Sequence, residues 1–125
     1  MLTIARYGTR DLERAKSFYD AIAVILGASR VMDRPEAVGY KGPEGVMFIV
    51  GKPFAGEATA GNGTQVAFAA PSRAVVDAAH AKALELGGRC EGPPGVRGPD
   101  PNGFYGAYFR DPDGNKLLVF RFGPP

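Results

Sequence analysis

The sequence contains an internal repeat, and this feature restricts the possible folds more than any other. Segment 40–50 resembles segment 109–119 at an offset of 69 residues, and segment 3–27 resembles segment 64–88 at an offset of 61. The matched positions include Pro43 with Pro112, Glu44 with Asp113, Gly45 with Gly114, Tyr7 with Phe68, Asp11 with Ser72 and Gly27 with Gly88. The chain is therefore predicted to contain two copies of one unit of about sixty residues.

The two copies are expected to form a single domain. A chain of 125 residues, 45% of them hydrophobic, has enough apolar side chains for one compact core. Half of that length would give only a marginal core, so the copies should share a sheet or an interface. We place module one at about residues 1–53, a linker rich in Ala, Gly and Thr at about 54–62, and module two at about 63–122.

Each copy has the pattern of one strand, one helix and three strands. Apolar residues recur at three- and four-residue steps after Asp11 and after Ser72, the expected N-caps, and Gly27 and Gly87 are placed to end the two helices. Strands are predicted at 2–8, 28–34, 36–42, 46–52, 64–70, 89–91, 104–110 and 116–122. The fold class is therefore α+β, with two tandem β-α-β-β-β modules.

The turns between strands account for the paired carboxylates. Asp111, Asp113 and Glu44 resemble acid–base pairs, but each lies in a turn with Pro and Gly, where capping and backbone hydrogen bonds are the usual role of such side chains. The segment 92–103, rich in Gly and Pro, is predicted to be a loop inserted in the second copy, with a binding role or disorder. Within it, Arg97 would either contact a ligand as part of a lid or face solvent.

Composition and charge exclude several classes of function. A net charge of +2 without a run of basic residues gives no indication of nucleic acid binding. Cys90 is the only cysteine, so no intrachain disulfide and no paired-cysteine metal site is possible. No apolar run approaches the length of a membrane span, and no signal pattern opens the chain. We expect a soluble cytoplasmic protein that contacts neither nucleic acid nor membrane.

The helix segment Asp11–Tyr19 and the turn Asp111–Asn115, in two tandem β-α-β-β-β units, resemble the vicinal oxygen chelate superfamily. That superfamily includes glyoxalase I, the bleomycin resistance proteins and the extradiol dioxygenases. Segments 62–73 and 94–97 look like one bacterial glyoxalase-related branch. The resemblance covers nearly the whole chain. It implies curled mixed sheets that form a cavity, and a homodimer whose modules pair within or between chains.

The resemblance also identifies the positions at which related proteins hold a metal ion. Those positions fall here on Ile4, Ile49, Gln65 and Leu118, where relatives usually have His or Glu. Three aliphatic groups and one amide cannot hold a divalent metal, so we expect no metal and no other cofactor. The only histidine, His80, is expected to be a packing or surface residue. Cys90 has no histidine close in sequence and is not expected to act as a nucleophile.

Strand alternation predicts the residues of a binding site. If the four ligand-equivalent positions point inward, Arg6, Met47, Ala67, Lys116 and Phe120 share their side, while Ala5, Phe48, Val66 and Val119 face the helices. Arg6 would offer a forked donor to an anion, or else lie at the sheet edge, and Gln65 would orient a ligand or be a satisfied polar residue. At most one of Tyr105 and Tyr108 should line the cavity. The candidate ligand-binding residues are Arg6, Gln65, Met47, Arg97, Tyr105, Tyr108, Leu118 and Phe120, and no catalytic residue is assigned.

Two functions from different classes follow. The first is a metal-free protein that binds a small neutral or anionic molecule in the cavity between the modules, like the bleomycin resistance proteins that the chain resembles. The alternative is a glyoxalase I-like lyase or isomerase acting on a small carbonyl or thiol-conjugate substrate. A dioxygenase is disfavoured because the expected positions offer iron no ligands.

Overall fold

The structure, a computed structural model, describes residues 1–125 as two four-stranded sheets and two helices. The elements are β1 (Ile4–Gly8), α1 (Leu12–Leu26), β2 (Ser29–Asp33), β3 (Ala37–Lys41), β4 (Met47–Gly51), β5 (Val66–Ala69), α2 (Arg73–Glu85), β6 (Arg89–Arg97), β7 (Phe104–Arg110) and β8 (Lys116–Phe122).

Both sheets have the same topology. The strand orders are β1-β4-β3-β2 and β5-β8-β7-β6. In each sheet the first strand pairs in parallel with the last, and the other pairs are antiparallel. The prediction of an α+β fold with two β-α-β-β-β units is therefore confirmed. We use "module one" for β1, α1 and β2 to β4, and "module two" for β5, α2 and β6 to β8.

The helices begin and end where the sequence predicts. Asp11 and Ser72 are the N-caps, and each side chain accepts a hydrogen bond from a backbone N–H of the first helical turn. Gly27 has φ 75° and Gly87 has φ 94°, left-handed conformations that glycine adopts without strain and that end a helix. Neither helix is long and apolar enough to cross a membrane.

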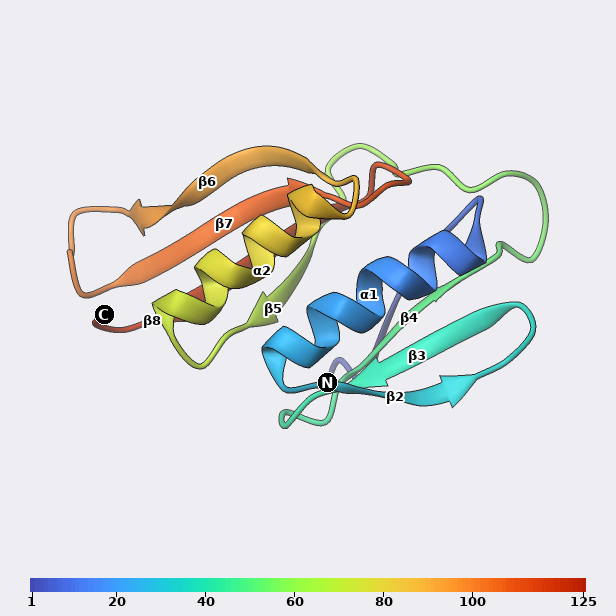
Figure 1. Cartoon of the computed structure of the whole chain (residues 1–125), viewed down its shortest axis with the longest axis horizontal. Helices are drawn as coiled ribbons and strands as arrows, with labels where there is room; N and C mark the ends of the chain where they lie inside the picture. Colours follow the sequence, from blue (N-terminus) through green and yellow to red (C-terminus); the bar gives the residue numbers. More distant parts are fainter.

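The modules meet through their helices. Figure 1 shows α1 and α2 next to each other on the same side of the molecule, in front of the two sheets. Phe18 of α1 is fully buried, and its ring lies 6.3 Å from the ring of Phe109 in β7, so the first helix contacts the second sheet. One continuous cluster of buried apolar side chains includes both helices and both sheets. Neither module therefore has a complete core of its own.

Alternation along the strands gives each sheet one face toward the helices and one face away from them, which we call the outer face. On the helix side, Ala5 lies beside Phe48, and Val66 lies beside Leu117. The outer faces carry Ile4 beside Met47, Arg6 beside Ile49, Ala67 beside Leu118, and Ala69 beside Phe120. The residues of β1, β4, β5 and β8 that the sequence predicts to line the site thus share one face within each sheet.

Strand β6 is longer than predicted. The structure continues it through the segment expected to be a loop, as far as Arg97, and only residues 98–103 connect it to β7. The pairing with β7 is irregular on both sides of Gly92. Pro93 and Pro94 have no N–H to donate, which an edge strand with a bulge tolerates and a central strand does not. Arg97 Nη1 and Nη2 donate to the carbonyl oxygens of Gly95 and Pro93 within the same segment, at 2.8 Å each.

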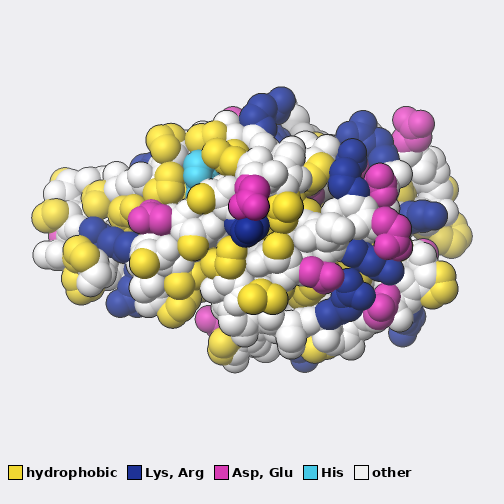
Figure 2. Space-filling view, viewed as in Figure 1, with side chains coloured by type: hydrophobic (Ala, Val, Ile, Leu, Met, Phe, Trp, Pro, Cys, Tyr) yellow, Lys and Arg dark blue, Asp and Glu magenta, His cyan; other side chains and the backbone are white.

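Charged side chains of both signs mix on the face that carries the helices. Figure 2 shows basic and acidic groups interspersed over the half of this face that belongs to module one. Arg30 bridges Asp20 and Asp33 there, and Lys16 also reaches Asp33. This face therefore presents no large patch of one sign.

One turn of module two fastens the two modules together. Asp113 Oδ2 accepts a hydrogen bond from the Thr9 hydroxyl at 2.5 Å, and Oδ1 accepts one from the Arg10 backbone N–H at 2.9 Å. The Arg14 guanidinium lies 3.1 Å from the same Oδ1 atom. The Asp113 side chain is only 4% exposed although it carries a charge. We call this set of contacts the Asp113 lock.

A second carboxylate in the same turn supports the Asp113 lock. Asp111 is buried, and its Oδ2 accepts hydrogen bonds from the Tyr19 hydroxyl at 2.5 Å and from Asn115 Nδ2 at 2.9 Å. Asn115 Nδ2 also donates to the Gly8 carbonyl of module one at 3.0 Å. Burial raises the pKa of Asp111, while the hydrogen bonds from Tyr19 and Asn115 oppose that rise. The turn is therefore held to β1 and α1 at several points.

We expect the variant Asp113→Asn to unfold more easily at neutral pH, by about 1–3 kcal/mol, because it loses a charged acceptor with several donors. Burial disfavours the charge of Asp113, but hydrogen bonds from Thr9 and Arg10 and the charge of Arg14 outweigh burial and lower the pKa of Asp113. A lowered pKa means that this stabilisation is present above the unfolded value of about 3.9 and is lost as the pH falls through the folded value.

Urea unfolding followed by circular dichroism measures this effect at about pH 7 and about pH 3. The gap between wild type and variant should shrink at the lower pH. The matched control is Glu57→Gln, which removes an exposed charge from the connecting segment. A gap that stays the same at both values would show that the charge of Asp113 does not fasten the modules.

Candidate functional site

A cavity with a volume of about 600 Å³ lies between the two modules. It is formed by α1, by the connection from β3 to β4 and by β5. Fifteen of its nineteen lining residues are hydrophobic. The lining residues are Leu2, Ala5, Tyr19, Ile22, Ala23, Leu26, Ala28, Tyr40, Gly42, Pro43, Glu44, Val46, Phe48, Gln65, Val66, Ala67, Phe68, Ala69 and Phe120. We call it the inter-module cavity.

Aromatic side chains from three elements form one wall of the inter-module cavity. The Phe48 ring of β4 lies 4.9 Å from the Tyr19 ring of α1 and 5.1 Å from the Phe68 ring of β5, the latter edge to face. Tyr19, Ile22 and Leu26 reach the cavity together because residues three and four apart share one face of a helix. The wall is therefore built from core positions of both modules and is held by packing.

Some polar groups of the cavity have hydrogen-bond partners within the chain, and others have none. The Tyr19 hydroxyl donates to Asp111 at 2.5 Å, and the Tyr40 hydroxyl donates to Asp20 at 2.7 Å. Burial, together with these carboxylates, raises the pKa of both tyrosines, so both keep their protons at neutral pH. Glu44 and Gln65 also line the cavity, and neither side chain makes a hydrogen bond within the chain. They are the polar groups available to a ligand.

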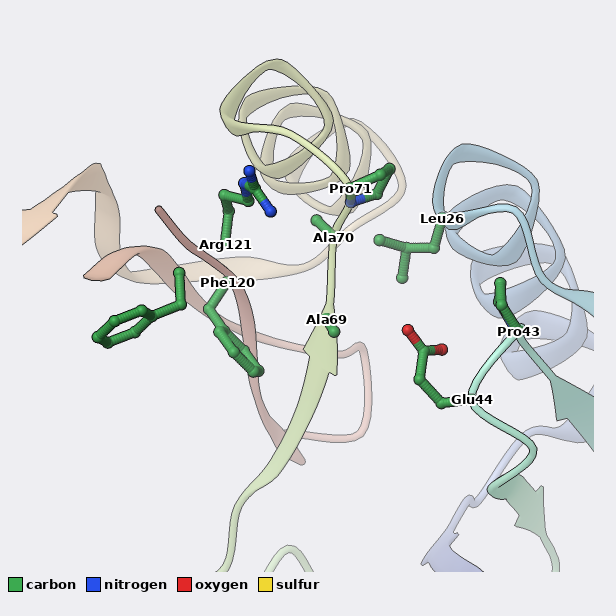
Figure 3. Close-up of a pocket in the computed structure, with 9 residues that line it drawn as sticks. Leu26, Pro43, Glu44, Ala69, Ala70, Pro71, Phe120 and Arg121 are labelled. Atoms are coloured by element: carbon green, nitrogen blue, oxygen red, sulfur yellow. The ribbon is translucent and has the colours of Figure 1, made fainter. Parts of the chain in front are cut away.

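A smaller hollow of about 340 Å³ adjoins the inter-module cavity. It shares Leu26, Pro43, Glu44, Ala69 and Phe120 with the larger cavity. Figure 3 shows the Glu44 carboxylate pointing into the space between Leu26 and Ala69. The two hollows therefore meet at Glu44.

Two of the candidate site residues line the inter-module cavity. They are Gln65, which lies just before β5, and Phe120 of β8. Of the other candidates, Arg6 and Met47 lie on the outer face of the first sheet, where Arg6 Nη2 donates to the Lys52 carbonyl at 2.7 Å. The sequence predicted which residues share a face. It did not show that the core shared by the modules would form on the helix-facing sides of the sheets, nor that Ala67, Ala69 and Phe120 on the outer face around β5 would also reach the inter-module cavity.

The remaining candidates lie on the second sheet and divide between its two faces. On the outer face, the Arg97 guanidinium carbon and Lys116 Nζ lie over the Tyr108 ring at 5.7 and 5.2 Å from its centre, and Leu118 pairs with Tyr108. Tyr105 lies on the helix side, where its hydroxyl donates to Asp77 at 2.6 Å. The two tyrosines thus lie on opposite faces, as strand alternation requires. The role of the outer-face group in ligand binding stays a prediction.

The residues that the resemblance places at metal-ligand positions do not fit a divalent metal ion. Ile4, Ile49 and Leu118 have no donor atoms, and Gln65 offers one amide oxygen. No group of three or more His, Cys, Asp or Glu side chains elsewhere in the chain is arranged to hold a metal. We therefore derive no chemistry that depends on a metal at this site.

The structure places a histidine beside the only cysteine, which the sequence analysis missed. His80 Nε2 of α2 lies 3.3 Å from Cys90 Sγ of β6. His80 is buried, as expected for a packing residue, and burial lowers the pKa of His80 while nearby Asp77 opposes this. Ten residues of sequence separate the two side chains, and the packing of α2 on β6 brings them together. That Cys90 does not act as a nucleophile stays a prediction.

Comparison with known proteins agrees with this architecture. Residues 3–119 match the family model described as Glyoxalase/Bleomycin resistance protein/Dioxygenase superfamily. A glyoxalase/bleomycin resistance protein from Albidiferax ferrireducens T118 is 38% identical with a TM-score of 0.87, and the match covers 97% of this chain and 98% of that one. A lactoylglutathione lyase from Agrobacterium tumefaciens is 25% identical with a TM-score of 0.64, over 97% and 92% of the two chains.

A glyoxalase-related enzyme from Fulvimarina pelagi shares the fold, with 20% identity, a TM-score of 0.74 and coverage of 97% and 87%. No curated protein matches the chain. The duplicated topology, the match over residues 3–119 and the full-length likeness to the Albidiferax protein lead to one conclusion. The chain belongs to the glyoxalase/bleomycin resistance protein/dioxygenase superfamily.

Proposed function

We propose that the chain binds a small, mainly apolar molecule in the inter-module cavity, without the help of a metal ion. The observation that carries this proposal is the cavity itself, whose volume of about 600 Å³ and hydrophobic lining are typical of small-molecule sites. Binding there would cover the Tyr19, Phe48 and Phe68 rings. The donor-poor residues at the ligand-equivalent positions support independence from metal.

The position of Arg6 in the structure does not support the ligand charge that the sequence predicts. The sequence predicts a neutral or anionic ligand on two grounds, the net charge of +2 and an Arg6 side chain that points into the cavity. In the structure Arg6 is exposed at the outer face and donates to the Lys52 carbonyl, so it does not line the inter-module cavity. We therefore propose a ligand with an apolar body, and the proposal does not require an anionic group on it.

A glyoxalase-type lyase or isomerase is the alternative. The likeness to the Agrobacterium lactoylglutathione lyase favours it, and such chemistry needs a group that accepts a proton. The hydroxyls of Tyr19 and Tyr40 are poor bases because both are engaged and have raised pKa values. Glu44 would have to serve. Turnover of a hemithioacetal that is lost in Glu44→Gln would favour the lyase, and binding without turnover would favour the binding protein.

We also propose that two copies associate through the outer faces of the sheets. Ile4 is 50% exposed and Phe122 is 71% exposed, although both are large and apolar. The Phe104 and Phe120 rings stack on the same side of the second sheet, at 5.5 Å between centres. A second copy would cover these side chains and would bring the outer-face candidates Arg6, Met47, Tyr108 and Leu118 into an interface.

Filling the inter-module cavity should abolish ligand binding. Ala69 is exposed, lines both hollows and has room for a larger side chain at the cavity mouth. We expect Ala69→Trp to weaken binding of a neutral fluorescent dye such as Nile red by about tenfold or more, since the indole occupies the same space. Ala81→Trp on the exposed side of α2 is the control, because Ala81 lines neither hollow. Equal binding by both variants would place the dye elsewhere.

Removal of metal should leave binding unchanged. Protein purified without a histidine tag is expected to contain much less than one zinc, nickel or iron atom per chain by mass spectrometry, because the ligand-equivalent positions lack donors. Nile red should bind equally before and after treatment with a chelator. One tightly held ion per chain would contradict the metal-free proposal.

Association through the outer faces should be visible in the molar mass. Light scattering after gel filtration is expected to give about twice the chain mass of 13.2 kDa. Ile4→Lys should shift the protein toward the monomer, because it places a charge on the face that becomes buried. Val24→Lys, at a position that is 77% exposed on α1, is the control and should leave the mass unchanged. A monomer in the unmodified protein would contradict the proposal.

A further inference from the structure

The two turns that the repeat aligns have the same geometry. Gly45 has φ 83° and Gly114 has φ 89°. The Gly45 N–H donates to the Gly42 carbonyl at 3.2 Å, and the Gly114 N–H donates to the Asp111 carbonyl at 2.9 Å. Glu44 therefore occupies in module one the turn position that Asp113 occupies in module two.

The surroundings of the two carboxylates differ. Asp113 meets the Thr9 hydroxyl and the Arg10 N–H in the Asp113 lock. The repeat aligns Thr9 with Ala70 and Arg10 with Pro71, which have neither a hydroxyl nor a backbone N–H at the matching places. Glu44 lines a hollow with both residues and makes no hydrogen bond or ion pair. The interface between the modules is thus fastened at one end and open at the other.

The open end leads into the inter-module cavity. In Figure 3 the Glu44 carboxylate points between Leu26 and Ala69, while the Arg121 side chain on the far side of Ala70 extends toward α2. The neighbours of the carboxylate on this path are apolar, and the cavity behind it is lined by aromatic rings. A free carboxylate at the mouth of an apolar cavity attracts a positive charge attached to an apolar body.

We propose that the ligand is a hydrophobic amine, whose ammonium group binds Glu44 while its aromatic or aliphatic body fills the inter-module cavity. This inference rests on the proposed small-molecule function and specifies the class of ligand. The ammonium replaces the donors that Thr9 and Arg10 supply to Asp113 at the closed end. Glu44 is therefore the residue that selects the charge of the ligand, and the rings of Tyr19, Phe48 and Phe68 select its apolar body.

Three ligands with one skeleton separate the contribution of charge from that of apolar burial. Naphthylmethylamine, naphthylmethanol and naphthoate carry a positive, a neutral and a negative group on the same ring system, and displacement of Nile red measures their affinities. We expect the amine to bind about fivefold more tightly than the alcohol, as a partly exposed ion pair allows, and the naphthoate to bind most weakly. The preference for the amine should decrease at high salt.

Two variants that replace a carboxylate by an amide of the same size test whether Glu44 causes the preference for the amine. Glu44→Gln should bring the amine to the affinity of the alcohol and leave the alcohol unchanged, whereas the control Glu57→Gln should change neither, since Glu57 lines neither hollow. Equal affinities of amine and alcohol in the wild type, or an amine preference that persists in Glu44→Gln, would overturn the inference while the cavity proposal stands. Failure of all three ligands and of Nile red to bind would overturn both.

Discussion

The arrangement of this chain depends on a pair of carboxylates in the turn between β7 and β8. Asp111 and Asp113 are both nearly removed from solvent, where a carboxylate is costly unless hydrogen-bond donors surround it. Module one supplies donors from the Thr9 hydroxyl and the Arg10 N–H, just before α1, and from the Tyr19 hydroxyl. Asn115 in the turn itself supplies further donors to Asp111. The modules must therefore dock in one orientation to satisfy these groups. Apolar contact between the helices adds stability and would tolerate other orientations more easily.

This constraint acts at one end of a nearly symmetric interface, and the asymmetry has a functional consequence. The repeat supplies a second turn of the same shape, but Ala70 and Pro71 stand where donors would be needed to close it. The aromatic side chains of α1, β4 and β5 pack against one another and form one wall of the cavity that remains at this end. The two modules have the same topology, and the absence of these donors at one end distinguishes a turn available to a ligand from the structural turn at the other end.

The sequence predicted the fold well because its signals are local or repeated. Helix boundaries follow from Asp11, Ser72 and the glycines after each helix, and the module pattern follows from the repeat. The extent of β6 was not predictable from Pro93 and Pro94, since proline interrupts most strands and only the edge position makes it acceptable. The site was predicted in part. Strand alternation groups residues by face, but which faces of two modules meet is decided by tertiary packing, and this placed Gln65 and Phe120 at the cavity and Arg6 away from it.

The two prolines of β6 also affect how this protein behaves at high concentration. A strand at the border of a sheet presents unpaired backbone groups, and another chain can add to them and start a growing fibril. Pro93 and Pro94 remove two donors from the border strand of the second sheet, and the irregular pairing around Gly92 distorts its edge. Sheet extension is therefore obstructed along β6. The segment that sequence reasoning treats as a simple insertion thus protects a duplicated, two-sheet protein against polymerisation through that border.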